Sequence, residues 1–95
     1  MPTYERSPEF DKMLASLSPE DRKRFRETIF EKFLPDLKKG AFRKGLGVRK
    51  YQAGGPGVLE MRWAPDGRAL FRFGPESKPG EPHIQWIAVG SHTIF

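Results

Sequence analysis

Apolar and polar residues alternate between Val58 and Phe73, on both sides of the turn signal Pro65-Asp66-Gly67. In such a turn Pro presets φ, Asp stabilises the bend and Gly takes the left-handed position. The segment therefore predicts a β-hairpin with a three-residue loop, whose expected cross-strand pairs are Ala64 with Arg68, Arg62 with Leu70, and Glu60 with Arg72. Since side chains alternate across a strand, one face of the hairpin is apolar and carries Leu59, Met61, Trp63, Ala69, Phe71 and Phe73.

The other face of this hairpin carries three arginines, Arg62, Arg68 and Arg72, and a single acid, Glu60. The planar guanidinium fork suits phosphate oxygens, so three of them on one sheet face favour a phosphate-binding surface. The alternative is a solvated outer face with surface ion pairs, in which Glu60 is a strut for Arg72.

Two segments near the N-terminus carry the same helix-start signal. Ser7-Pro8-Glu9 and Ser18-Pro19-Glu20 each supply a hydroxyl cap, Pro at the first helical position and an acid in the first turn. Apolar residues then recur at helical spacing, and they are Phe10, Met13, Leu14, Leu17, Phe25, Ile29 and Phe33, with Phe30 and Leu34 as further candidates. Pro35 is expected to end or kink the second helix near Phe33 or Leu34. The sequence thus predicts a short helical hairpin.

The segment between Asp36 and Glu60 contains no acid, and it predicts a basic loop that leads into a strand over residues 46–51. Its basic residues are Lys38, Lys39, Arg43, Lys44, Arg49 and Lys50. If Leu46 and Val48 face the core, Arg49 shares the arginine-bearing face of the hairpin.

The remaining strands complete a single domain over residues 1–95. Residues 83–89 are apolar on both faces, which is typical of a central strand, and residues 4–6 fit a brief edge strand. We therefore expect an α+β fold, in which the helical hairpin packs on one face of a mainly antiparallel sheet of three to four strands.

Composition narrows the partners and the compartment. A net charge of +5 and a pI near 9.8 favour a polyanionic partner. The chain has no Cys, and no apolar run approaches the ~20 residues that cross a bilayer, so we expect a soluble, cytoplasmic protein without membrane contact. His83 and His92 are the only histidines and no carboxylates stand at ligand spacing. We expect no metal and no cofactor.

RNA binding, with or without cleavage, is the chemistry that remains. Cleavage without a metal needs proton transfer and cations around the phosphorane. Arg49, Arg62 and Arg68 could supply the cations, and His92 the proton transfer, because its ordinary pKa lies near working pH. His92 as an ordinary strand-end residue and Glu60 as a base or a strut remain open, whereas His83 is expected to be structural or solvated.

Several short motifs resemble the RelE/ParE toxin superfamily. They are the segments Tyr4-Glu5-Arg6-Ser7-Pro8-Glu9-Phe10, Leu46-Gly47-Val48-Arg49-Lys50, Leu59-Glu60-Met61-Arg62-Trp63, Gly67-Arg68-Ala69-Leu70-Phe71, and the closing Ile87-Ala88-Val89-Gly90-Ser91-His92-Thr93-Ile94-Phe95 with its Gly-x-His ending. Together with the two helices they cover nearly the whole chain. The resemblance implies a RelE-like fold and a small basic toxin that an antitoxin wraps and silences.

The resemblance also implies an activity. RelE-like members cleave mRNA in the ribosomal A site without a metal, whereas ParE-like members inhibit DNA gyrase. By position, Arg49, Arg62, Arg68 and His92 match the functional positions of cleaving members, and Lys44 and Lys50 match weaker RNA-positioning sites. Two residues depart from the pattern, since Phe95 stands where many cleaving members have Tyr and Glu60 where some have Lys.

The interpretation favoured by these features is a ribosome-associated, metal-independent mRNA endonuclease, or mRNA interferase, that blocks translation. Its catalytic residues would be Arg62, Arg68 and His92, and its RNA-binding residues Lys44, Arg49, Lys50, Arg72 and Phe95. The expected partners are a cognate antitoxin, mRNA and the ribosome, with no small-molecule substrate. A ParE-like gyrase inhibitor and a catalytically degenerate antitoxin-binding module are the alternatives.

Overall fold

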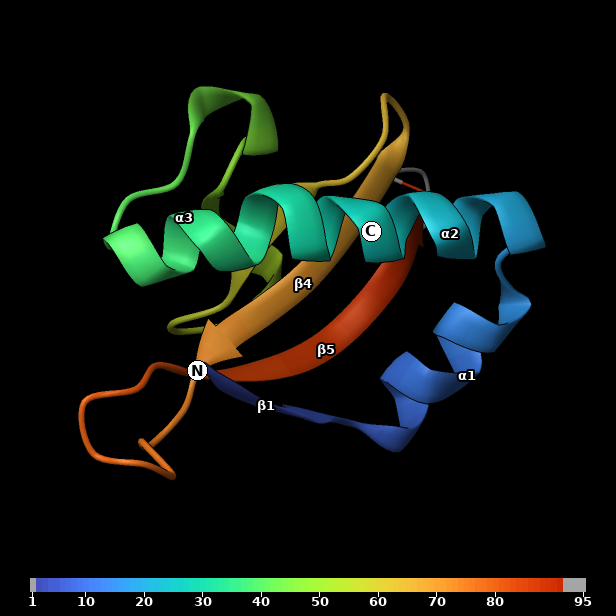
Figure 1. The fold of residues 1–95 in the computed structure, drawn as a ribbon. Helices are drawn as coiled ribbons and strands as arrows, with labels where there is room; N and C mark the ends of the chain where they lie inside the picture. Colours follow the sequence, from blue (N-terminus) through green and yellow to red (C-terminus); the bar gives the residue numbers. More distant parts are fainter. Residues whose placement is uncertain (1, 92–95) are drawn as a thin grey trace.

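The computed structural model describes residues 2–91, which form an α+β domain with helices packed in front of a mixed sheet (Figure 1). The helical elements are α1 (Pro8–Ser16), α2 (Pro19–Thr28), the π-helical η1 (Ile29–Phe33), α3 (Leu34–Lys39) and the 3₁₀ turns η2 (Lys44–Leu46) and η3 (Gln52–Gly54). The strands are β1 (Thr3–Arg6), β2 (Arg49–Lys50), β3 (Leu59–Arg62), β4 (Gly67–Phe73) and β5 (His83–Ser91). The sheet order is β1-β5-β4-β3-β2. The expected fold class is confirmed, although the sheet has five strands rather than three to four.

Both predicted helix starts are confirmed. The hydroxyl oxygen of Ser7 accepts a hydrogen bond from the backbone N–H of Phe10 at 3.0 Å, and that of Ser18 accepts one from Asp21 at 3.1 Å. Each cap satisfies a backbone donor that the first helical turn leaves without a partner. Among residues 2–91, no helix is long and apolar enough to span a membrane.

Pro35 was expected to end or kink the second helix, and the structure shows that it does not end it. Helical backbone runs without a break from Pro19 to Lys39, and Pro35 lies in the first turn of α3. In an α-helix the Pro35 ring would clash with the carbonyl of Glu31. The π segment widens this turn, and the Leu34 N–H donates to the carbonyl of Ile29, five residues back. The extra residue of the π turn accommodates the proline.

The core is a cluster of aromatic rings between the helices and one face of the sheet. Phe33 is fully buried, and its ring centroid lies 5.1 Å from that of Phe71 and 5.2 Å from that of Trp86. Phe25 meets Trp63 edge-on at 5.9 Å. Such ring pairs add to the large area that each aromatic side chain buries. They fix α2 and η1 over β4 and β5.

The central position predicted for the last strand is confirmed. β5 lies between β1, which is parallel to it, and β4, which is antiparallel. Leu70 pairs with Ala88 and Phe71 with Trp86, so Ile87 is an extra residue in a β-bulge. The bulge turns both Trp86 and Val89 toward the helices, which explains why this strand is apolar on both faces.

The hairpin forms with a register two residues away from the predicted one. Arg62 pairs with Arg68 and Glu60 with Leu70, so the pairs predicted for Arg62, Glu60 and Ala64 are wrong. The Gly67 N–H donates to the Ala64 carbonyl at 3.0 Å, which makes Gly67 the last residue of the turn. Because the shift is an even number of residues, every side chain keeps its predicted face.

Gly67 also differs from its predicted role, because it does not have a positive φ. A Cβ atom at this position would lie 2.5 Å from the Trp63 ring. The Trp63 indole N–H donates to the Arg68 carbonyl at 2.9 Å, which holds the ring against the turn. Glycine is therefore required here by the close approach of Trp63 rather than by backbone conformation.

The strand predicted over residues 46–51 is reduced to the two residues of β2. Leu46 instead ends the 3₁₀ turn η2, and Gly47 follows in the left-handed conformation with φ of 58°. Leu46 is buried and Val48 packs against the same core, as predicted. Strand pairing starts only at Arg49, since the left-handed residue interrupts extended backbone.

Candidate functional site on the open face of the sheet

The face of the sheet opposite α2 and α3, called the open face below, brings two of the predicted arginines together. Arg62 on β3 and Arg68 on β4 are direct cross-strand partners, and β5 continues the row at Gly90. Side chains of directly paired residues point to the same face and lie within reach of one ligand. The observed register therefore places the two guanidinium groups closer than the predicted one did.

The two arginines differ in their contacts. The Nη1 of Arg68 donates to the carbonyl of Gly67 at 2.9 Å and, at longer range, to those of Pro65 and Ala64. Arg62 is exposed, and its side chain passes over Gly47, where an added Cβ would lie 3.7 Å from the Cβ of Arg62. Within residues 2–91, the Arg62 guanidinium makes no hydrogen bond or ion pair. Arg68 thus braces the turn, while Arg62 faces solvent.

Glu60 is paired with Arg49, not with Arg72 as predicted. The two residues are cross-strand partners, and Arg49 Nε contacts Glu60 Oε1. The Glu60 side chain is 9% exposed, whereas that of Arg49 is 74% exposed. A buried carboxylate that is paired with a cation is well placed to orient Arg49. It is poorly placed to act as a base, because a base must reach the substrate.

The open face contains a hollow of about 410 Å³. Arg49, Glu60 and Arg68 line it, with the backbone and side chains of residues 50–53. Tyr51, one of these residues, packs against a second small apolar cluster of Val58, Leu70 and Ala88, all buried. Sequence reasoning overlooked this cluster, although Leu70 is an apolar residue on the arginine-bearing face of the predicted hairpin.

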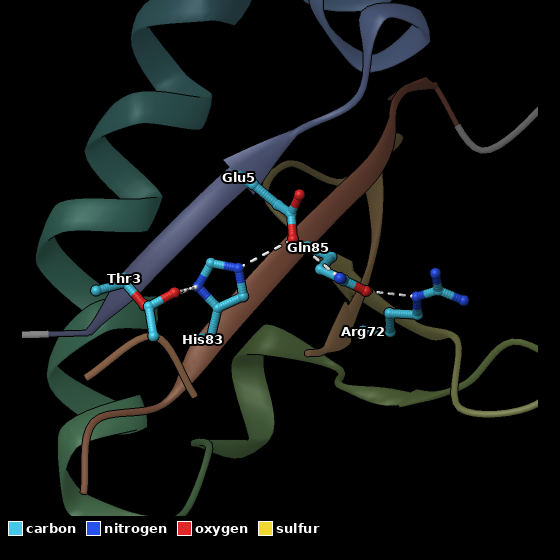
Figure 2. A network of polar contacts seen from close by, with 6 residues as sticks. Thr3, Glu5, Arg72, His83 and Gln85 are labelled. Atoms are coloured by element: carbon cyan, nitrogen blue, oxygen red, sulfur yellow. Dashed lines mark hydrogen bonds and ion pairs between the residues drawn. The ribbon is translucent and has the colours of Figure 1, made fainter. Parts of the chain in front are cut away.

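Arg72 belongs to a different part of the open face (Figure 2). Its Nε donates to Gln85 Oε1 at 2.6 Å, and Gln85 Nε2 donates to Glu5 Oε1 at 2.9 Å. Four residues of extended strand, about 13 Å, separate it from Arg68. The structure therefore does not group Arg72 with Arg49, Arg62 and Arg68, and its RNA-binding role stays a prediction.

His83 occupies the centre of the Figure 2 network and is structural. Its ring is buried, with Nδ1 2.7 Å from Thr3 Oγ1 and Nε2 3.0 Å from Glu5 Oε1. Hydrogen bonds from Gln85 and then from His83 hold the pKa of the Glu5 carboxyl below its usual range. These contacts tie β1 to β5.

A second fixed carboxylate anchors the basic loop that precedes β2. Asp36 is buried and accepts three hydrogen bonds from Arg43, through the backbone N–H and Nε at 2.8 Å and through Nη2 at 2.9 Å. The Arg43 side chain, and then its backbone N–H, lower the pKa of Asp36 to about 2. Arg43 is thus a structural residue that holds the loop to Asp36. The next residue, Lys44, is exposed at the start of η2.

The Asp36 contact predicts a loss of stability in acid. The folded state lowers the pKa of this carboxyl, so its contribution is full above about pH 4, near the unfolded value, and disappears as the pH falls toward about 2. Urea unfolding of the wild type and of Asp36→Asn between pH 5 and pH 2 measures this contribution to the free energy of unfolding. The two proteins should converge in stability as the pH falls, whereas Glu20→Gln, which changes an exposed acid on α2, should follow the wild type. A gap between wild type and Asp36→Asn that is constant with pH would contradict this account.

The remaining predicted residues are only partly located. Lys44, in η2, and Lys50, in β2, are both exposed. Lys50 pairs with Leu59, whose side chain packs against the main core, so Lys50 lies on the face opposite Arg49. His92 and Phe95 lie outside the described residues, and β5 ends at Ser91, which pairs with Gly67 beside Arg68. In residues 2–91, no group of three or more His, Cys, Asp or Glu side chains is arranged to hold a metal ion. The predicted site residues that the structure locates are thus cationic side chains, and their role in binding stays a prediction.

The chain shares its fold with several solved toxins. The chain aligns with the toxin of the Escherichia coli DinJ-YafQ toxin-antitoxin complex at a TM-score of 0.69 and 12% identity, covering 99% of this chain and 96% of that one. A metal-bound toxin from Helicobacter pylori aligns at a TM-score of 0.67 and 21% identity, and the alignment covers 100% of this chain and 99% of that one. YafQ from E. coli strain BL21(DE3) aligns at a TM-score of 0.66 and 12% identity, and the alignment covers 99% of this chain and 97% of that one. No protein-family model and no curated protein matches the chain. The RelE-like toxin fold implied by the sequence is thereby confirmed.

Proposed function

We propose that this chain is the toxin of a toxin–antitoxin pair and that it cleaves mRNA on the ribosome, in the cytoplasm, without a metal. The observation that carries the proposal is the cross-strand pair of Arg62 and Arg68 on the open face, with Arg49 lining the same hollow as Arg68. Three guanidinium groups on neighbouring strands suit a phosphate that gains charge during the reaction.

The roles follow from position. Arg62 and Arg68 stabilise the phosphorane, and Arg49, oriented by Glu60, holds an adjacent phosphate. His92, which follows Ser91 in the sequence, supplies the proton transfer. Lys44 and Lys50 position the RNA, and Phe95 stacks on a base.

The partner part of the proposal is a cognate antitoxin. E. coli YafQ, which shares the fold, was solved in a toxin-antitoxin complex with DinJ. A chain with net charge +5 suits an acidic partner that covers its cationic surface.

Inducible expression in a bacterium, with mapping of mRNA 5′ ends, tests the proposal. We expect growth arrest and new mRNA ends in frame with codons for the wild type, and neither for Arg68→Ala/His92→Ala. New ends that persist in the double variant would remove both residues from the mechanism.

A binding module without catalysis is the second candidate, because two of the three cations are already engaged. Arg49 is paired with Glu60, and Arg68 with the turn carbonyls. In the same experiment this candidate gives no arrest, whereas a ParE-like gyrase inhibitor gives arrest with intact mRNA and damaged DNA.

A further inference from the structure

The loop that joins β2 to β3 is closed by its own hydrogen bonds. The Tyr51 N–H donates to the Val58 carbonyl at 2.9 Å, across the mouth of the loop. Within it, the Gly54 N–H donates to the Tyr51 carbonyl at 3.1 Å, and the Gly55 N–H donates to the Gln52 carbonyl at 3.3 Å. Gly55 has a φ of 92°, a conformation that glycine adopts at no steric cost. The loop is therefore an element of defined shape.

The ring of Tyr51 is held from two sides. A Cβ atom added to Gly54 would lie 2.8 Å from Cδ2 of this ring, so the bare backbone of Gly54 comes close to it. Tyr51 also packs against the buried cluster of Val58, Leu70 and Ala88 on the open face. Contacts from the loop and from the sheet thus fix the orientation of a partly exposed aromatic ring.

Tyr51 lies beside the arginines of the candidate site. It follows Arg49 by two residues of extended backbone, a distance of about 7 Å along the chain. Tyr51 and Gln52 line the same 410 Å³ hollow as Arg49 and Arg68. Binding sites for small groups typically measure about 300–1,000 Å³, so one nucleotide could enter. The hollow therefore combines guanidinium groups, an aromatic ring and a side-chain amide.

Groups of these three kinds together suit single-stranded RNA. Unpaired bases stack on aromatic rings, and side chains read the edges of the bases through hydrogen bonds. Arg49 and Arg68 supply charge for phosphate. The uncharged amide of Gln52 carries a donor and an acceptor side by side, so it can pair with a base edge that presents both. Gln52 is exposed, and its amide can reach a ligand in the hollow.

We propose that the loop after β2 is a base-recognition site, in which an unpaired RNA base stacks on Tyr51 and the Gln52 amide reads its edge. Arg49 holds a phosphate beside that base. The inference deepens the proposed function and rests on it, because it names the element that selects the cleaved sequence. Base selection by this loop is separate from the action of Arg62 and Arg68 on the reacting phosphate.

Binding of uncleavable RNA tests the site without any cleavage. The probes are uridine hexanucleotides with A, C, G or U at the third position and a 2′-O-methyl group on every nucleotide, which blocks attack by the 2′ oxygen. Fluorescence anisotropy follows their binding to the purified chain. We expect the wild type to bind one of the four probes more tightly than the others.

Two substitutions of Tyr51 separate stacking from packing. Tyr51→Phe keeps the ring, whereas Tyr51→Leu keeps an apolar side chain against Val58 but has no aromatic face. We expect Tyr51→Phe to bind the preferred probe nearly as tightly as the wild type, and Tyr51→Leu to bind it roughly tenfold more weakly, the effect of one lost stacking contact. Tyr4→Leu, which removes a 64% exposed ring on β1, is the matched control and should not change binding.

Variants of Gln52 test the reading of the base edge. Gln52→Ala should bind the four probes equally. Gln52→Glu should shift the preference to the guanosine probe, because a carboxylate only accepts hydrogen bonds and guanine presents two neighbouring donors on one edge.

A glycine pair tests the orientation of the ring. Gly54→Ala should weaken binding of the preferred probe, because the added Cβ would displace the Tyr51 ring without removing any group that contacts RNA. Gly45→Ala is the matched control, since Gly45 also lacks a positive φ and its added Cβ would meet open space among the described residues.

Three outcomes would overturn the inference. They are wild-type binding that is absent or equal for all four probes, equal binding by Tyr51→Phe and Tyr51→Leu, and a preference that is unchanged in Gln52→Glu. Mapping of mRNA ends separates the inference from the proposed function. Selective binding by a chain that leaves mRNA intact would refute the nuclease and keep the base site. Cleavage next to the same bases in the wild type and in Gln52→Glu would keep the nuclease and refute the base site.

Discussion

Arg68→Ala is expected to lower the rate of mRNA cleavage roughly 10²–10³-fold, about 3–4 kcal/mol of transition-state stabilisation. The reason is the position of Arg68, which faces Arg62 across the β3–β4 pair and lines the hollow that Arg49 and Glu60 share. A guanidinium fixed by the turn carbonyls is already oriented when charge develops on the phosphorane. The rate constant of single-turnover cleavage on programmed ribosomes measures the effect.

Controls must separate catalysis from the bracing of the turn. Arg68→Lys keeps the charge but loses the planar fork, so it should recover only part of the rate. Arg62→Ala should cost a similar factor with little loss of stability, because Arg62 is exposed. Lys23→Ala, an exposed change on α2, should leave the rate unchanged. Full activity of Arg68→Ala in a folded protein would exclude Arg68 from the chemistry.

Features set by neighbours in sequence were predictable. Each cap, at Ser7 and at Ser18, is a hydrogen bond between the serine hydroxyl and the amide three positions later. All the residues that form it are therefore contained in the short motif. The two faces of the hairpin follow from alternation, which an even shift of register does not change. For this reason Arg62 and Arg68 were placed on the correct face although their pairing was wrong.

Features set by contacts between distant residues were not predictable. The register depends on the Trp63 ring lying against Gly67, and the turn signal alone does not show this. The partner of Glu60 depends on how β2 reaches β3, and the continuation of the helix past Pro35 depends on the π turn. The apolar groove between β1 and the continuous helix α2-η1 is formed by residues from both ends of the chain.

Phe33→Ala is expected to destabilise the fold by about 3–5 kcal/mol, a large share of the about 5–15 kcal/mol that stabilises a domain. The ring is fully buried and lies close to three other rings, those of Phe42 in a loop, Phe71 in β4 and Trp86 in β5. No neighbour could fill the cavity without moving another ring. Urea unfolding measures the change.

The matched control is Phe30→Ala, three residues earlier in the same π segment. Phe30 is 64% exposed, so its truncation should change stability by no more than about 0.5 kcal/mol. The contrast tests the helix itself, because the π turn sets which residue of η1 faces the rings of the sheet. Equal losses in the two variants would contradict the observed rotation of η1, which buries Phe33 and exposes Phe30.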